Sequence, residues 1–280
     1  MVASLLVSVV LLGFKLSALK RLVQMNQRRI ELKAALVLLQ PQVEAEKRDV
    51  WLADVEHDAK QREDRIAAMD STAGREYNLL EANLLKKGAD MFAGFEASDA
   101  SAKQLTHSPL VTCSETKIDE ATGLLLGRAV VLIRATPQEM VAHVLNYESH
   151  FNKSITDQTI YVRSEVVEHV NAYHTIIFHR IKATGASDRT FLTSIVAKKV
   201  EDDPPTYLVV SLPIRQHDKI TPKDEKGAVR AESHRAFKLT EVAEGITKLE
   251  YACSLNLRGS IPQAITNKVS VPGQMHGAPP

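Results

Sequence analysis

The residues best suited to chemistry in this 280-residue sequence are ten histidines and two cysteines. The histidines of the second half, among them His174, His179, His217 and His234, are scattered along it. None of them has an Asp, Glu or Cys at a spacing that resembles a metal site or a nucleophile with its base. We therefore expect packing or surface histidines, and we expect neither an enzyme nor a metal or other cofactor.

The cysteines, Cys113 and Cys253, lie far apart and belong to no CxxC or Cys/His cluster. This usage predicts reduced thiols that pack inside a cytoplasmic protein. With 44% hydrophobic and 25% charged residues, the composition is that of an ordinary globular protein. The net charge of +1 and the lack of any RNA- or DNA-reading motif argue against a nucleic-acid partner.

Residues 1–20 form an apolar segment with three competing interpretations. The run from Val2 to Phe14 is apolar, basic residues follow it, and no acidic residue precedes Glu31. As a membrane anchor it is short of the usual length of about 20 residues, and its flanking charges would leave the remainder in the cytoplasm. A transit peptide and an apolar helix that packs on a partner are the alternatives.

Residues 21–74 are predicted to form a helical arm. Helical spacing continues to about Gln40, where Pro41 ends it, and a second, highly charged helix is predicted over 43–69. The sparse apolar stripe of that helix is typical of a helical hairpin or a coiled coil, and such an arm could bind a protein partner. Residues 71–74 indicate a break, and a third helix is predicted over 75–96.

Residues 75–280 are expected to form one domain of mixed structure. Its strands are predicted, from an apolar period of two, over 124–133, 160–167, 174–183, 191–200, 207–212, 228–239 and 246–257. One helix interrupts them, because Thr136 is a good N-cap and Pro137 fits the first helical turn. This order predicts an α+β fold, an antiparallel sheet with helices on one face.

The last strand is followed by a corner, Gly259-x-x-Pro262, and by a terminal helix. Glycine takes backbone angles that other residues avoid, and proline suits the first turn of a helix. Pro272 and Gly273 should break the helix near Ser270. We therefore expect a short terminal helix, or a chain that was cut inside a longer one.

From about Leu79 onward, four stretches together resemble the START family of lipid-binding domains. "FHRIKATGASDRTF" resembles that family's Tyr-x-x-x-Lys strand followed by Ser-x-Arg-Asp-Phe, with Thr190 in place of Asp. "YLVVSLPI" resembles the strand that ends in Ser-Val before a mobile loop, and "GAVRAE" resembles a Gly-x-Val-Arg-Ala strand start. "LEYACSLNLRGSIPQAITNKV" resembles the family's ending through Asp-x-x-Gly-x-x-Pro, with Asn256 in place of Asp.

The resemblance implies a helix-grip fold, in which a C-terminal helix closes a curved antiparallel sheet. It also implies that one lipid is buried in an internal cavity and is transferred or sensed at a membrane surface, with no chemistry performed. An apolar cavity lowers the cost of carrying an acyl chain through water by about 0.8 kcal/mol for each buried CH₂. The charged loop over 213–227 would then be a gate, with a plain solvated hairpin loop as the alternative.

The expected lipid contacts come from strand alternation and from the resemblance. They are Glu168, Phe178, Asp188, Phe191, Thr193, Ile195, Val209, Ser211, Tyr251, Cys253 and Ile265. Two arginines are expected elsewhere, Arg180 on the outer face with a carboxylate partner and Arg230 in a structural ion pair. The reason is that a buried charge is costly unless it is paired.

Two features of the sequence argue against phosphatidylcholine as the ligand. Members of the family that bind sterol or phosphatidylcholine commonly keep an arginine at the position of Ile195, and its absence removes a buried positive charge. Members that bind choline build aromatic cages for it, because a ring face attracts a cation. The only tryptophan here, Trp51, lies outside the domain.

A comparison with the ceramide-transfer branch favours a neutral or amide-bearing lipid, such as ceramide or a sterol. Glu168 and Tyr251 match two of its head-group residues, whereas Asp188 and Val209 replace its Gln and Asn. Glu168 could instead be a solvated strand end, and Tyr251 a core tyrosine bonded to the backbone. The alternative for the whole chain is a helical scaffold or interaction protein with a START-like docking domain.

Overall fold

The computed structural model describes residues 45–70, 76–96, 103–104, 113–120, 122–149, 161–183, 186–264 and 266–267. The apolar segment 1–20, the first helix of the predicted arm, the break at 71–74 and Ile265 lie outside the described residues. Within the described ranges, no helix combines the length and the apolar character needed to span a membrane.

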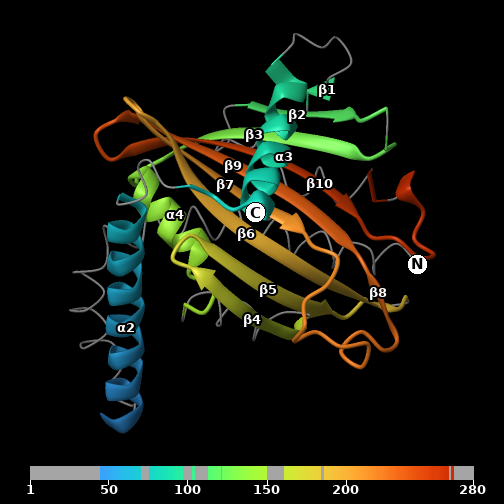
Figure 1. Ribbon diagram of the computed structural model, residues 1–280, viewed down its shortest axis with the longest axis horizontal. Helices are drawn as coiled ribbons and strands as arrows, with labels where there is room; N and C mark the ends of the chain where they lie inside the picture. The colour runs from blue at the N-terminus through green and yellow to red at the C-terminus, as the bar shows by residue number, and fades with distance from the viewer. Residues whose placement is uncertain are drawn as a thin grey trace.

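The helices of these ranges are α2 (Ala45–Asp70), α3 (Leu79–Glu96) and α4 (Pro137–Leu145). The strands are β1 (Lys103–Gln104), β2 (Cys113–Ile118), β3 (Leu125–Ile133), β4 (Tyr161–Asn171), β5 (His174–Ile181), β6 (Asp188–Asp202), β7 (Pro205–Pro213), β8 (Ala228–Arg230), β9 (Glu232–Ala243) and β10 (Ile246–Asn256). Helix α2 runs beside α4 and extends past the edge of the sheet (Figure 1).

The strands form a single sheet in the order β1-β2-β3-β10-β9-β7-β6-β5-β4, with β8 beside β6. Neighbours along this path are antiparallel, and the described β6–β8 pair is parallel. The predicted α+β class is thereby confirmed. The sequence analysis missed β1 and β2, since most positions of β2 are polar. It also joined β8 to β9, which separate at Ala231, where the backbone N–H donates to Thr190 O (2.9 Å).

Helix α4 begins where the sequence predicts it. Thr136 is its N-cap and its hydroxyl accepts a hydrogen bond from Glu139 N (3.2 Å). In return, Glu139 Oε2 accepts one from Thr136 N (3.0 Å), which completes a capping box. This cap orients the buried side of α4, with Met140, Val141 and Leu145, against the sheet.

The sheet has a helix on each face, so the expectation that its helices share one face is wrong. The α3 face packs on α3 and carries Val196, Leu208, Val210, Leu212, Ala236 and Ala252. The α4 face packs on α4 and carries Ile133, Ile177, Ile195, Val209, Leu239 and Leu249. Since successive side chains of a strand point to opposite faces, neighbours such as Ile195 and Val196 are both buried, but in different layers.

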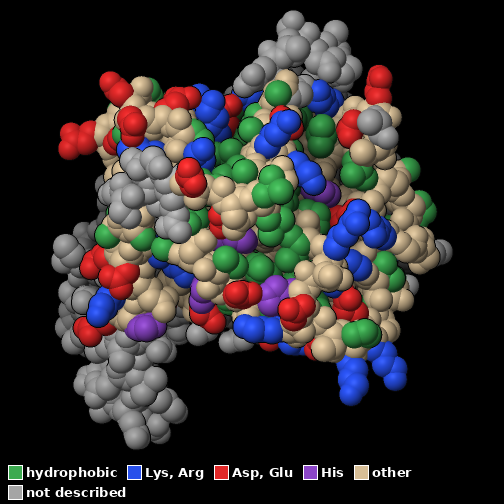
Figure 2. Space-filling view, in the orientation of Figure 1, with side chains coloured by type: hydrophobic (Ala, Val, Ile, Leu, Met, Phe, Trp, Pro, Cys, Tyr) green, Lys and Arg blue, Asp and Glu red, His purple; other side chains and the backbone are tan. Residues whose placement is uncertain are grey.

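Figure 2 looks onto the α3 face. Hydrophobic side chains gather at its centre, around α3, and charged side chains lie mainly toward the rim. The contact there is close: a Cβ added at Gly88 of α3 would collide with Val210 Cγ1 of β7. The glycine therefore allows the helix backbone to lie directly on the strand.

A buried polar cluster also attaches α3 to the sheet. Glu81 Oε1 accepts a hydrogen bond from Asn171 Nδ2 (2.9 Å) and lies 2.9 Å from His174 Nδ1. His174 Nε2 lies 2.7 Å from Ser194 Oγ on the next strand. Burial alone would raise the pKa of Glu81, but these hydrogen bonds outweigh it and hold the pKa below its ordinary 4.5.

We expect Gly88→Ala to lower the free energy of unfolding by about 1–3 kcal/mol, because Val210 must move to admit the methyl group. This loss should exceed the roughly 1 kcal/mol that alanine gains over glycine in a helix. Urea unfolding measures the change, with Asn83→Ala on the exposed side of α3 as the control. A Gly88→Ala protein as stable as Asn83→Ala would contradict this packing.

The Glu81 cluster predicts a defined pH dependence. A lowered carboxyl pKa contributes stability that is complete above about pH 4.5 and is lost as the pH falls through the folded-state value. We expect Glu81→Gln to destabilise the protein by about 1–3 kcal/mol at neutral pH and to flatten the acid decline of stability. Urea unfolding between about pH 7 and pH 3 tests both, with exposed Glu76→Gln as the control. An unchanged slope would show that Glu81 is not the titrating group.

Candidate functional site

Most of the predicted lipid contacts meet on the α4 face. Strand register aligns Ile195, Ser211 and Cys253 in one row across the sheet, and Val209 and Tyr251 in the next. Phe191 and Thr193 precede Ile195 on the same side of β6. The side chains brought together, all buried, are Phe191, Thr193, Ile195, Val209, Ser211, Tyr251 and Cys253.

Three predicted contacts lie on the α3 face instead. Phe178 pairs in register with Leu192 and packs in a cluster with Ile176 and Val167, away from the α4 face. Asp188 Oδ2 accepts a hydrogen bond from Arg180 Nε (2.8 Å). The structure therefore does not bring Phe178 and Asp188 together with the rest of the set.

Glu168 is on the α3 face because of a β-bulge. The register of β4 against β5 shifts between Val166 and Glu168, so Val166 faces α4 whereas Glu168 pairs with Ile176. Without that bulge, residues two apart would share a face. Glu168 Oε2 lies 2.7 Å from His217 Nε2, and this hydrogen bond lowers the pKa of Glu168.

The two arginines expected outside the site are paired as predicted. Arg180 pairs with Asp188, and Arg230 pairs with Glu225 in the loop before it. Glu225 also accepts a hydrogen bond from Thr190 Oγ1 (3.0 Å), so it links the loop to β6. Arg180 with Asp188 joins β5 to β6, Arg230 with Glu225 joins β8 to the loop, and neither pair brings a charge to the α4 face.

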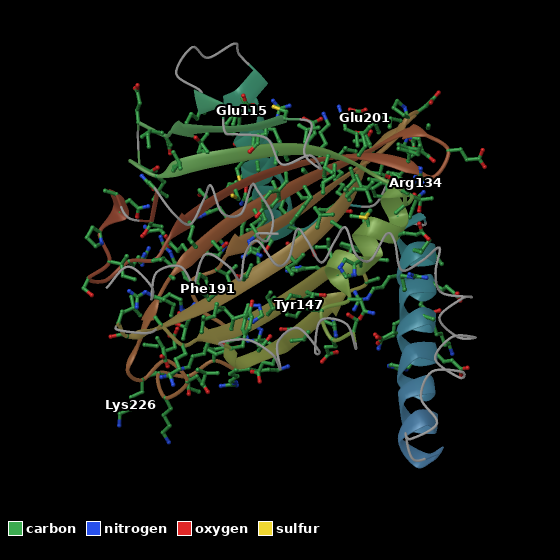
Figure 3. All side chains as sticks on the ribbon, turned by 180° about the vertical axis from the view of Figure 1, so that it is seen from behind. Glu115, Arg134, Tyr147, Phe191, Glu201 and Lys226 are labelled. Carbon is green, nitrogen blue, oxygen red and sulfur yellow. The ribbon has the colours of Figure 1, made fainter. Side chains whose placement is uncertain are left out.

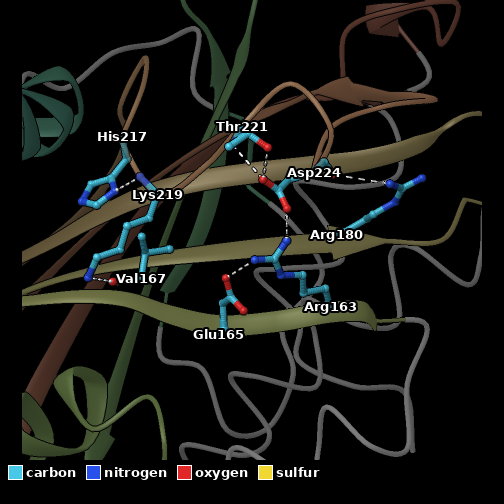
Figure 4. Close-up of polar contacts among 8 residues, drawn as sticks. All are labelled: Arg163, Glu165, Val167, Arg180, His217, Lys219, Thr221 and Asp224. Carbon is cyan, nitrogen blue, oxygen red and sulfur yellow. Dashed lines mark hydrogen bonds and ion pairs between the residues drawn. The ribbon is translucent and has the colours of Figure 1, made fainter.

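The loop over 214–227 is attached to β4 and β5 by several polar contacts (Figure 4). Asp224 accepts hydrogen bonds from Thr221 N and Oγ1 (2.7 Å each) and pairs with Arg163, which also binds Glu165 Oε1 (2.5 Å). Lys219 Nζ donates to Val167 O (3.0 Å). The Thr221 hydrogen bonds and Arg163 hold the pKa of Asp224 well below its ordinary 3.8, so its carboxylate persists in moderately acidic solution.

The structure places polar residues on the α4 face that the sequence analysis did not select. Tyr147 follows α4, and its hydroxyl lies 2.7 Å from His179 Nε2. The ring of Tyr161 meets His179 edge-on, with centroids 5.2 Å apart. Figure 3 labels Tyr147 and Phe191 on this side of the sheet. Alternation along β5 would have found His179, two residues from Ile177, but the segment that supplies Tyr147 has no strand pattern.

Arg235 is the other residue that was missed. It occupies the row of Ser211 and Cys253, between them on β9, and its Nε donates to Ser233 Oγ (3.1 Å). Alternation could have found it, because Phe237 and Leu239 of the same strand face α4. Its charge argued against this placement, because a charged residue is not expected on a buried face.

Burial keeps the thiol and a phenol of this face in their protonated forms. Burial raises the pKa of Cys253 to about 12, so its thiol stays protonated. Burial likewise raises the pKa of Tyr251, whose ring packs on Phe237 at a centroid distance of 5.0 Å. Within the described part of the chain, no group of three His, Cys, Asp or Glu residues could hold a metal ion.

Comparison with known proteins defines the fold. No protein-family model and no curated protein matches the sequence. Among solved structures, human StAR-related lipid transfer protein 5 is 15% identical over 71% of this chain and 92% of its own, with a TM-score of 0.55. Human STARD10 is 14% identical over 66% of this chain and 73% of its own, with a TM-score of 0.51.

A bacterial structure shows the same likeness. The STAR-related lipid transfer protein from Xanthomonas axonopodis is 15% identical over 64% of this chain and 94% of its own, with a TM-score of 0.51. The chain therefore has the fold of a START domain, as its four motifs indicate.

We expect Asp224→Asn to loosen the loop, because the amide cannot pair with Arg163 and accepts the Thr221 hydrogen bonds less strongly. Hydrogen exchange over 214–227 should become about threefold faster or more, since exchange reports local opening. Asp218→Asn, at an exposed position of the same loop, should leave the rate unchanged. Equal rates in both variants would mean that Asp224 does not attach the loop.

Proposed function

We propose that this protein binds one lipid in an internal cavity on the α4 face and transfers or senses it at a membrane surface. The START fold carries this proposal, together with the rows of buried side chains that meet on that face. Two of the structures compared above are named for lipid transfer. We propose no catalytic step, since binding alone accounts for the side chains assembled there.

The apolar composition of the face suits an acyl chain or a sterol ring. Ile195, Val209 and Phe191 would contact the hydrocarbon, and each buried CH₂ would contribute about 0.8 kcal/mol to binding. Thr193, Ser211 and Tyr251 would supply hydroxyl groups for the polar end. Glu168, Phe178 and Asp188 are left out of this proposed lining, because they lie on the other face.

Between the lipids compared by sequence, we favour a neutral or amide-bearing one, such as ceramide or a sterol, over phosphatidylcholine. The support is Ile195, which brings no positive charge for a phosphate head group at its position on β6. Tyr251 supports an amide-bearing head, whereas Glu168 lies on the other face and gives no such support.

We also propose roles for the loop and for the ends of the chain. The loop over 214–227 would be the gate, opened when its contacts to β4 and β5 break. The terminal helix would be a lid, either short or cut inside a longer one, and residues 1–20 of a cytoplasmic protein would be an anchor, a transit peptide or a helix that packs on a partner. A helical scaffold remains the second candidate, because α2 contacts the sheet edge through Arg65, which donates to Ala172 O (3.4 Å).

The full chain, purified without detergent, should carry one apolar adduct in native mass spectrometry and should exchange fluorescent lipid between vesicles. Deletion of residues 1–70 should leave the exchange intact if the protein is a carrier. A folded protein with no adduct and no exchange would contradict the lipid-carrier proposal and favour the scaffold.

Cys253→Trp should abolish lipid uptake, because the indole would fill the space that the lipid needs. Val242→Trp, at an exposed position of β9, is the matched control. Unaltered uptake by a folded Cys253→Trp protein would place the lipid elsewhere.

Tyr251→Phe should change the ratio of ceramide to sterol bound in competition more than it changes stability.

A further inference from the structure

Arg235 differs from the other arginines of the sheet. Arg128, Arg163, Arg180, Arg230 and Arg258 each pair with a carboxylate. The buried Arg189 donates to the carbonyl oxygens of Leu257 and Arg258 (2.7 and 3.3 Å). Arg235, by contrast, donates only to the neutral hydroxyl of Ser233 among the described residues.

The guanidinium lies on the face assigned to the lipid. Strand register places Arg235 between Ser211 and Cys253, in the same row as Ile195, two strands away. Ser233, its partner, is buried on the same side of β9. Arg235 itself is half-buried, so it is partly removed from the water that would otherwise stabilise its charge.

Three tyrosines interact electrostatically with this charge. Burial raises the pKa of Tyr147, Tyr161 and Tyr251, and the positive charge of Arg235 partly opposes that rise in all three. Tyrosines from three separate segments thus lie within electrostatic reach of one guanidinium. Neutral at ordinary pH, they can donate or accept hydrogen bonds but cannot neutralise it.

A guanidinium partly withdrawn from water is costly unless an anion pairs with it. Its planar set of N–H donors matches two oxygens of a carboxylate or phosphate, with which it forms parallel charge-assisted hydrogen bonds. We propose that Arg235 binds an anionic oxygen group, a carboxylate or a phosphate, at the head of the bound lipid, with the neighbouring tyrosines as further hydrogen-bond donors. This proposal rests on the lipid-carrier function proposed above.

The Arg235 site predicts acidic lipids as ligands, a class that the sequence did not suggest. Ile195 carries no positive charge on β6, but Arg235 supplies one from β9 in the same row. The hydrocarbon would lie along the apolar rows of β6 and β7 while its acidic head contacts β9. Acidic lipids should therefore bind more tightly than neutral lipids with the same hydrocarbon.

The experiment uses pairs of lipids that differ only in the anionic group. Oleic acid and oleyl alcohol test a carboxylate, and phosphatidic acid and diacylglycerol with identical chains test a phosphate. Displacement of a bound fluorescent lipid from the full chain measures each affinity. We expect the acidic member of at least one pair to bind about tenfold tighter or more, as for a hydrogen-bonded charge, and the pair that shows it identifies the head group.

Arg235→Gln should remove that advantage and leave the affinity of the neutral member within about twofold. Lys238→Gln, which removes the same charge from the other face of β9, is the control and should change neither affinity. Equal binding of acid and alcohol to the wild-type protein would overturn the Arg235 assignment while leaving the carrier function intact. Failure of the fluorescent lipid itself to bind would instead overturn the carrier function.

Discussion

Side-chain alternation in the central strands is the constraint on which the rest of this structure depends. β6, β7 and β10 are apolar on both faces, because α3 covers one face and α4 packs on the other. Residues two apart therefore share a face, and register joins them into rows across four strands. The candidate site is formed by two such rows, so its geometry follows from the packing of the whole sheet.

The polar interactions of the α3 face show how this arrangement is kept. Glu81 and His174 attach α3, Gly88 allows it close to β7, and Arg163 with Asp224 attaches the long loop. All of these groups are satisfied by protein partners. Asp188, which resembles a ligand contact by motif, likewise pairs with Arg180 on this face.

Arg235 follows a different rule. Its charge lies on the α4 face with one neutral hydroxyl as its hydrogen-bond partner among the described residues. Register places Arg235 in the row of Ile195, so this row carries its positive charge on β9 and not on β6.

The sequence by itself determined the α+β class, most strands, the capped start of α4 and the residues of β6 that share a face with Ile195. These features depend on local period and capping, which a single chain displays directly. Only the tertiary structure decided the face of Glu168, because the β4 bulge reverses alternation without a sequence signal. It also decided that Tyr147 and His179 meet, and that Arg235 shares a row with Ile195, because folding brings together residues that are distant in the chain.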